Sequence, residues 1–225
     1  MSESKKLELT PSVSIIIAGA LVALAIIFTN NSAAGPTPLG VPTAEAQVRS
    51  VGAGDHLLGS PDAPIVLVEF SDFQCPYCNV IHPTLKKIVE ESNGQIAWVY
   101  RHLPLTSIHP EAEAAAVASE CVAEQLGNTG FWKFADTLFA NQARLGSAYY
   151  TEVAGQLGAD TGAFAACMNS GKYADKVAAD TAEAQSNGGN GTPFTVVVNT
   201  KTDKTAAVSG ALPYAQIMSV IKSVQ

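Results

Sequence analysis

The fold is decided by the stretch IVLVEFSDFQCPYC, residues 65–78, in which an apolar run leads into two cysteines separated by two residues. Residues 65–70 have the continuous apolar character of a buried strand, and a helical pattern follows the second cysteine. A cysteine at a helix N-terminus meets unpaired backbone N–H groups and the positive end of the macrodipole, which stabilise a thiolate. Pro76 suits the first turn, where its missing N–H has no partner to lose. The stretch therefore predicts thiol–disulfide chemistry at Cys75 and Cys78.

Two other uses of such a cysteine pair stay open on the motif alone. A structural zinc site takes four ligands, whereas the remaining cysteines, Cys121 and Cys167, are single and no histidine pair has zinc-finger spacing. The pair could instead form an inert structural disulfide. We expect no metal site and no cofactor.

Glu69 interrupts the apolar run six residues before Cys75. Burial of a carboxyl group raises its pKa, which suits a residue that passes protons to and from a buried thiol. The alternative is a glutamate at a strand end that reaches solvent. We predict the proton-transfer role.

A second motif lies far downstream, where the glycine- and asparagine-rich residues 187–191 precede Thr192, Pro193 and an apolar run at 194–198. Glycine permits close backbone approach, and a Thr-Pro bond at the start of a strand is a plausible cis peptide. A cis-proline there would leave the backbone of Thr192 free to pair with an incoming peptide.

Taken with Pro83 in the helix after the cysteines, these motifs resemble the DsbA-like group of thioredoxin-fold oxidoreductases over roughly residues 51–225. The resemblance implies an α/β thioredoxin fold, with a β-α-β unit first, a helical insertion at about 104–187 and a β-β-α closure. It also implies that Cys75 attacks, Cys78 resolves, Glu69 moves protons and Pro193 faces the disulfide. Pro76, Tyr77 and Thr192 are then expected beside the substrate.

The region of the helical insertion is rich in alanine and broken by glycine or asparagine. The expected helices are residues 110–126, 130–141, 151–157 and 172–186, with a closing helix at 213–224. Phe131, Trp132, Phe134 and Phe139 have the spacing of a packed helix face, so we expect them in the core. His82, beside Pro83, is expected to be partly exposed at the surface.

The N-terminal region is expected to lie outside the folded domain. Residues 12–29 form an uncharged apolar stretch between Lys5–Lys6 and Arg49, the next basic residue. As a helix this stretch covers about 27 Å, nearly a bilayer core. The positive-inside rule then makes residues 1–11 cytoplasmic, 12–29 a transmembrane anchor, 30–50 a linker and 51–225 an extracytoplasmic domain. The alternative is a cleaved signal peptide, with secretion or release into the periplasm.

Export favours stable disulfides, so the two remaining cysteines are expected to form one. Cys121 and Cys167 each lie on a short apolar stripe of an expected helix. We predict a structural disulfide between them. The alternative is two separate buried thiols.

Composition agrees with a single folded enzyme domain. The chain has 225 residues, 47% of them hydrophobic, and a net charge of -7, which argues against nucleic acid as a partner. We expect a monomer that acts on thiols of exported proteins and exchanges electrons with a membrane partner.

Sequence alone leaves the direction of electron flow open. We predict an oxidase that a quinone-linked membrane protein reoxidises, because no dimerisation module is evident in the sequence. An isomerase or reductase, which needs a reductant instead, and a non-catalytic membrane-tethered binding module are the alternatives.

Overall fold

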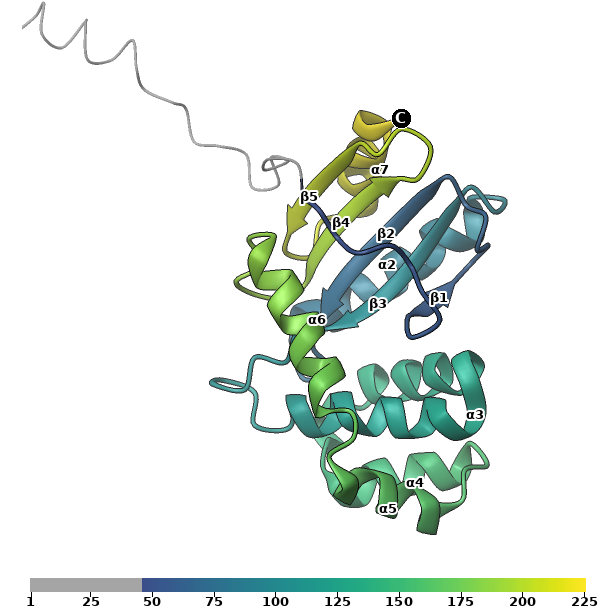
Figure 1. Cartoon of the computed structure of the whole chain (residues 1–225), viewed down its shortest axis with the longest axis vertical. Coiled ribbons are helices and arrows are strands. Elements are labelled where there is room, and N and C mark those ends of the chain that lie inside the picture. The colour runs from purple at the N-terminus through teal and green to yellow at the C-terminus, as the bar shows by residue number, and fades with distance from the viewer. Residues whose placement is uncertain (1–45) are drawn as a thin grey trace, which may run out of the picture. The chain divides into compact units, whose positions relative to one another are not determined.

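The structure, a computed structural model, describes residues 46–225. Its elements follow the order β1 (His56–Leu58), β2 (Ile65–Ser71), α2 (Pro76–Glu91), β3 (Ile96–His102), α3 (Ala112–Ala140), the short 3-10 helix η1 (Gln142–Arg144), α4 (Ser147–Gln156), α5 (Thr161–Ser170), α6 (Ala174–Ser186), β4 (Phe194–Asn199), β5 (Thr205–Ser209) and α7 (Tyr214–Val224). Figure 1 shows a sheet with several helices beyond one end of it. This arrangement confirms the expected thioredoxin-like α/β fold with a helical insertion.

The sheet has the strand order β1-β3-β2-β4-β5, with β2 at its centre. β2 runs parallel to β3 and antiparallel to β4, while β1 and β5 pair antiparallel at the edges. All seven residues of β2 and all seven of β3 are buried, which explains why the sequence of β2 is almost continuously apolar.

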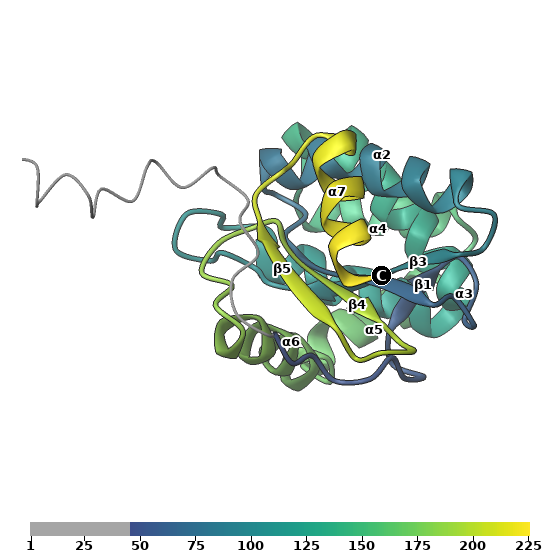
Figure 2. The same ribbon diagram turned by 90° about the horizontal axis from the view of Figure 1, so that it is seen from above.

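Helices cover both faces of the sheet, with α2 and α7 on one side and α6 on the other (Figure 2). Alternation along β2 sends Ile65 and Leu67 into the larger core, with residues of α2, α3 and α7. Val66, Val68 and Phe70 point to the other face, where Ala184 of α6 packs. Helix α2 therefore lies on the face of the sheet to which Glu69 also points.

The helical insertion begins with the long element α3. The sequence predicts separate helices at 110–126 and 130–141, and α3 covers both ranges, but the backbone at Gly127 (φ 65°, ψ -165°) is not helical, so two helices meet there at a kink as expected. Glycine adopts a positive φ without the steric cost that other residues would have. The expected aromatic core residues of this helix, Phe131, Trp132, Phe134 and Phe139, are all buried, which confirms that prediction.

The structure begins with a segment that packs on the domain. Ala46 is buried, and Arg49 forms ion pairs with Asp55, Asp180 and Glu183. Residues 46–50, part of the expected linker, therefore lie against α6. The expected cytoplasmic N-terminus 1–11, the anchor or signal segment 12–29 and linker residues 30–45 lie outside the described residues.

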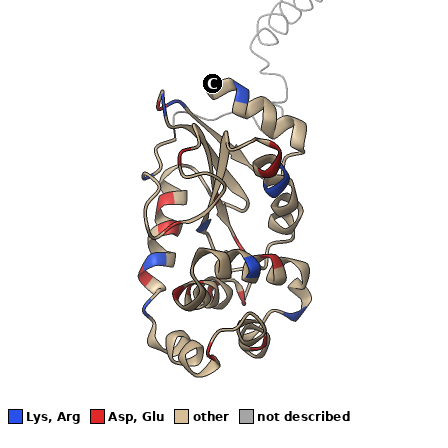
Figure 3. Ribbon diagram, turned by 90° about the vertical axis from the view of Figure 1, so that its right-hand side faces the viewer, with Lys and Arg blue, Asp and Glu red and all other residues tan. Residues whose placement is uncertain are grey.

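Across residues 46–225, no helix combines the length and the apolar character that crossing a membrane requires. In the view of Figure 3, acidic and basic positions are interspersed along the helices. Several form surface pairs, among them Arg144–Glu152 and Lys172–Glu124.

Candidate active site

The two motif cysteines lie where the central strand β2 gives way to α2. Cys75 is the N-cap of α2 and Pro76 begins the helix. Both cysteines are free thiols. Cys78 is fully buried, whereas Cys75 is 3% exposed beneath the exposed Pro76 and Tyr77. Only Cys75 therefore borders the surface from which a substrate arrives.

The environment of Cys75 stabilises its thiolate. A hydrogen bond from the Cys78 thiol is the largest cause that lowers the pKa of Cys75 to about 5, and the backbone N–H groups of Tyr77 and Cys78 add to it. These donors are the unpaired first-turn groups of α2. At neutral pH the reduced Cys75 is therefore mainly ionised.

The environment of Cys78 has the opposite effect. Burial raises the pKa of Cys78 well above its usual value, and the hydrogen bond it gives to Cys75 and the nearby Glu69 raise it further. A thiol with this pKa stays protonated at neutral pH. The two cysteines are thus chemically distinct, one a thiolate at the surface and one a thiol beneath it.

Glu69 lies on the sheet face beneath these cysteines and is 1% exposed. Neither carboxyl oxygen has a hydrogen-bond partner among the described residues. Burial raises the pKa of Glu69 to about 8, so the carboxyl group is mainly protonated at neutral pH. Solvent does not reach this carboxyl group, unlike that of a strand-end glutamate.

The second sequence motif meets the first in space. Pro193, joined to Thr192 by a cis peptide bond, directly precedes β4, which pairs with β2. The Thr192 carbonyl oxygen accepts a hydrogen bond from the Cys75 thiol at 3.5 Å, across 117 residues of sequence. Thr192 and Pro193 therefore lie beside Cys75, and the exposed Tyr77, at 64%, flanks the same site.

Polar side chains that the sequence did not single out hold the loop before α2. The Asp72 carboxylate accepts hydrogen bonds from the backbone N–H groups of Gln74 and Leu105 and from His109. The Gln142 amide, from η1, donates to the carbonyl oxygens of Phe73 and Cys75 at 2.9 Å each. The helical insertion therefore fixes the backbone of the nucleophilic cysteine directly.

A family model described as Thioredoxin matches residues 52–222. The chain belongs to the thioredoxin family. Among solved structures, Pseudomonas aeruginosa DsbA2 is 26% identical, with 79% of this chain and 97% of that chain aligned at a TM-score of 0.66. BdbD from Bacillus subtilis shares the fold, at 23% identity, 84% and 98% coverage and a TM-score of 0.63. These similarities confirm the resemblance to DsbA-like oxidoreductases.

Curated relatives of this thioredoxin-family chain include much longer proteins. The Na(+)/H(+) antiporter NhaA 3 of Salinispora tropica is 37% identical over 139 residues, which are 62% of this chain and 21% of the antiporter. The NhaA 1 antiporter of Mycolicibacterium gilvum is 35% identical over 149 residues, 65% of this chain and 24% of that protein. The chain thus spans about a quarter or less of these relatives, and their transport activity is not carried over to it.

The other cysteine pair of this thioredoxin-family chain lies in the helical insertion. Cys121 of α3 and Cys167 of α5 form a disulfide with an S–S distance of 1.97 Å. Both are buried, and neither belongs to the loop that carries Cys75. This pair therefore ties two helices of the insertion together.

His82 is an exception to the sequence interpretation, because it is 6% exposed rather than a surface residue. Its Nε2 lies 2.7 Å from Asp136 of α3, and its ring packs edge-on against Trp98 at 5.0 Å between centroids. Packing of α2 on α3 buries this side chain, which single-sequence spacing does not reveal.

His56 and His102, scattered in the sequence, meet at one carboxylate. Each Nε2 lies 2.8 Å from the same oxygen of Glu120, and Lys176 approaches that oxygen at 3.3 Å. The hydrogen bonds from these histidines lower the pKa of Glu120 strongly, although burial alone raises it. Within residues 46–225, no group of three or more His, Cys, Asp or Glu side chains is arranged to hold a metal ion.

Proposed function

We propose that this chain is an extracytoplasmic thiol–disulfide oxidoreductase that introduces disulfides into exported proteins through the pair Cys75–Cys78. One observation carries the proposal: Cys75, the cysteine that borders the surface, has a pKa lowered to about 5, and Cys78, which lies beneath it, has a raised pKa. A stabilised thiolate favours the reduced form of the pair and so makes its disulfide a stronger oxidant. The membership of the chain in the DsbA-like group supports dithiol–disulfide exchange in general.

The proposed reaction proceeds in two exchange steps. A substrate thiolate attacks the Cys75 sulfur, the Cys75–Cys78 bond breaks, and Cys78 leaves as a thiolate that takes up one proton. A second substrate thiolate then attacks the substrate sulfur of the mixed disulfide, and Cys75 leaves as a thiolate. Two electrons pass from the substrate dithiol to the enzyme, and Cys78 resolves mixed disulfides from which the substrate does not depart.

Glu69 supplies the proton in this proposal. Its carboxyl group, protonated below a pKa of about 8, is an acid buried on the Cys78 side of the site. Thr192, Pro193, Pro76 and Tyr77 border the exposed side of Cys75 and are the proposed contacts for the substrate chain. In the oxidised enzyme Cys75 has no thiol proton to donate, so the Thr192 carbonyl oxygen is free to accept a hydrogen bond from a substrate backbone.

The cellular setting is part of the proposal. The apolar stretch at 12–29, with Lys5 and Lys6 before it, supports export, either on a transmembrane anchor or after signal cleavage. The domain then acts as a monomer on thiols of exported chains. Turnover requires a membrane partner that accepts two electrons, such as a quinone-linked protein.

The deciding experiment mixes the oxidised enzyme with a reduced, unfolded protein that contains a cysteine pair and follows loss of free thiols. We expect stoichiometric oxidation by wild type and none by Cys75→Ser. Reduced Cys78→Ser, mixed with the disulfide form of the same protein, should be trapped as a mixed disulfide, because Cys75 attacks the substrate disulfide and no Cys78 thiol is present to resolve the product. The reduction potential should lie nearer the value of about -120 mV typical of strong oxidants than about -270 mV, which is typical of reductants.

Two outcomes would contradict this assignment. A potential near the lower value, with rapid reduction of insulin disulfides, would make the chain a reductase. Substrate binding that is unaltered in Cys75→Ser, with no exchange by wild type, would make it a binding module.

A further inference from the structure

Unpartnered polar atoms gather on one face of the sheet, beneath α2. Among the residues that the structure describes, Glu69, Ser71, Trp98, Tyr100 and Thr195 each bury a side-chain polar atom without a hydrogen-bond partner. Buried polar atoms without partners are uncommon, because each costs about 1–3 kcal/mol. These five residues bury six such atoms on one face of the sheet, which makes the group a candidate for a functional role.

Strand register brings these residues together. Glu69 pairs with Tyr100 of β3 on one side and with Thr195 of β4 on the other, so the three form one row across the sheet. Ser71 is two residues further along β2 on the same face, next to the loop that leads to Cys75. The row therefore lies under the start of α2.

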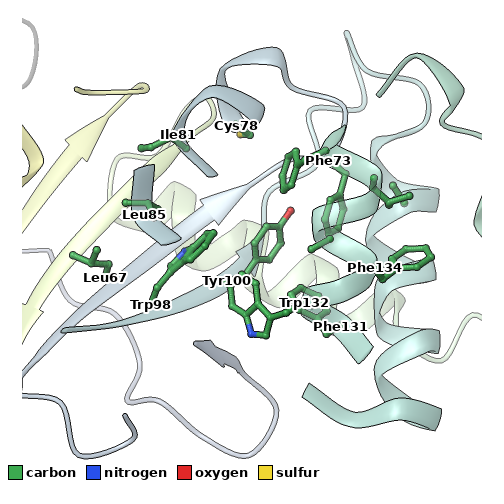
Figure 4. Close-up of a cluster of buried hydrophobic side chains, with 14 of the residues drawn as sticks. Leu67, Phe73, Cys78, Ile81, Leu85, Trp98, Tyr100, Phe131, Trp132 and Phe134 are labelled. Carbon is green, nitrogen blue, oxygen red and sulfur yellow. The ribbon is translucent and has the colours of Figure 1, made fainter. Parts of the chain in front are cut away.

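The Tyr100 side chain extends from β3 toward the start of α2. In Figure 4 its hydroxyl points to the side where Phe73 and Cys78 lie, and its ring stacks on Phe73 at 5.1 Å between centroids. Trp98 lies one row further from the motif, where it packs against Trp132 at 4.5 Å. The aromatic packing fixes where the Tyr100 hydroxyl lies.

Ser71 comes between the acid and the thiol along the chain, because it follows Glu69 on the same face of β2 and precedes the loop and the first turn of α2 that carry Cys75 and Cys78. Burial raises the pKa of Glu69, Cys78 and Tyr100, and in each case the Ser71 hydroxyl acts in the opposite direction. A hydroxyl can accept one proton and donate another at once. Ser71 is therefore placed between the acid and the thiol.

We propose that the Ser71 hydroxyl relays the proton between Glu69 and Cys78, and that Tyr100 is a positioning residue that orients this hydroxyl. The inference rests on the proposed exchange reaction and assigns two residues that the sequence did not single out. Thr195 shares the row on the far side of Glu69 and has no part in the relay.

The relay leaves atoms and charge in balance. When the Cys75–Cys78 bond breaks, the Cys78 sulfur carries the negative charge. Ser71 donates its proton to that sulfur and accepts the proton of Glu69, so the serine is unchanged and the charge ends on the Glu69 carboxylate. The same path in reverse removes the proton from Cys78 when the disulfide is re-formed.

Titratable groups face this path from the strands and from α2. Glu69 comes from β2, and Asp72 directly follows that strand. Tyr100 and His102 come from β3, Cys75 is the N-cap of α2, and Cys78 lies in the first turn of α2. β4 contributes the neutral Thr195, and α3 the apolar Phe131, whose ring meets Tyr100 at 5.3 Å. Below pH 8, Glu69 is the group of this set positioned to hold a proton for Cys78.

The test compares Ser71→Ala and Tyr100→Phe with the matched control Thr195→Val, which also removes one buried, unpartnered hydroxyl. Oxidised enzymes are mixed with dithiothreitol in a stopped-flow instrument between pH 5 and 9, in H2O and in D2O. The ratio of variant to wild-type rate at each pH cancels the ionisation of dithiothreitol. We expect Ser71→Ala to be about tenfold slower than wild type at pH 6, the loss expected when part of a general acid–base effect is removed.

The pH dependence separates a relay from a purely structural effect. The loss in Ser71→Ala should shrink above pH 8, where Glu69 no longer holds a proton, and Ser71→Thr should restore the rate. Tyr100→Phe should lose a smaller factor with the same pH dependence, and it decides the matter if Ser71→Ala fails to fold. Thr195→Val should match wild type throughout.

Either of two results would overturn the relay. In the first, Ser71→Ala and Tyr100→Phe react as fast as Thr195→Val at pH 6. In the second, their rates are lower than that of wild type by the same factor at every pH. A failure of the proposed function has a different signature. Exchange would then be absent from wild type or retained in Cys75→Ser.

Discussion

The chain has two cysteine pairs, and a buried glutamate accompanies each of them. Glu69, 1% exposed, lies under the free thiols Cys75 and Cys78, without a partner for either oxygen among the described residues. Glu120, 4% exposed, directly precedes the disulfide-bonded Cys121 and accepts hydrogen bonds from two histidines. The two glutamates are thus buried to a similar extent, but one lacks hydrogen-bond partners beside free thiols and the other is hydrogen-bonded beside a disulfide.

The difference shows that partners, more than burial, decide the state of a buried carboxyl group. The hydrogen bonds from the histidines hold the pKa of Glu120 well below its usual value, so it is a fixed anion that joins β1, β3 and α3. Burial is the largest cause acting on Glu69 and raises its pKa to about 8, so it can give or take a proton. The Glu120 carboxylate therefore keeps its charge, whereas the Glu69 carboxyl group can change its protonation state.

Removal of the Cys121–Cys167 bond should have the largest effect on stability. The residues are 46 apart in sequence, which in the chain-entropy model corresponds to about 4 kcal/mol of stability. We expect Cys121→Ala with Cys167→Ala to lose about that much in urea unfolding while the folded variant still exchanges disulfides with dithiothreitol. Loss of exchange from a folded double variant would show that the two cysteine pairs are not independent.

Glu120→Gln should destabilise the protein by about 3 kcal/mol, because it leaves His56, His102 and Lys176 facing a neutral amide in a buried place. Urea unfolding at pH 7 measures the loss. Glu124→Gln is the matched control, since Glu124 lies one turn further along α3 and pairs with Lys172 at the surface. Equal loss in the two variants would contradict the structural role of the Glu120 cluster.

Glu69→Gln should make the protein more stable but slower in disulfide exchange, unlike Glu120→Gln. The exchange rate should fall about a hundredfold at pH 7, because the proton donor for Cys78 is gone. Stability at pH 7 should rise by about 3 kcal/mol, since folding no longer requires uptake of a proton by a group whose pKa moves from 4.5 to about 8. A variant that is both slower and less stable would make Glu69 a structural residue like Glu120.

The parts of the molecule that were predictable from the sequence are those encoded by neighbouring residues. Cys75 and Cys78 are two residues apart, Glu69 is in the preceding strand, and Thr192 directly precedes Pro193. The DsbA-like fold followed from these motifs and is confirmed by the comparisons. The roles of the site residues stay predictions, although the structure brings these residues together.

The parts that were missed depend on contacts between distant segments. Gln142 binds the carbonyl oxygen of Cys75 across 67 residues, and His56 meets Glu120 across 64. A glutamine or histidine in these positions has no periodic pattern that marks it. β1 is three residues long, too short for alternation to be visible, and pairing with β3 alone defines it.

The pH dependence of stability offers the finest test of the contrast between the two regions. Glu69 has a folded pKa of about 8 against 4.5 when unfolded, so the stability it contributes is complete below pH 4.5 and is lost as pH rises through 8. His56 has a lowered folded pKa, chiefly through burial, so its contribution is present above pH 6.5 and is lost as pH falls below it. One region therefore weakens in alkali and the other in acid.

The redox state of Cys75 should decide whether the loss of stability at alkaline pH is observed. The pKa of its thiol falls from 9.0 to about 5 on folding, so its contribution is lost as pH falls from 9 to 5, opposite to that of Glu69. In the oxidised protein Cys75 does not titrate, and Glu69 acts unopposed. Between pH 6.5 and 8 we therefore expect the oxidised protein to lose up to about 1.4 kcal/mol per pH unit in urea unfolding, and the reduced protein to lose much less. The stability of oxidised Glu69→Gln should not change with pH between 6.5 and 8. This variant should still lose stability below pH 6.5, because the cluster of His56 and Glu120 is intact. An alkaline loss that survives in this variant would place the pH sensitivity outside the active site.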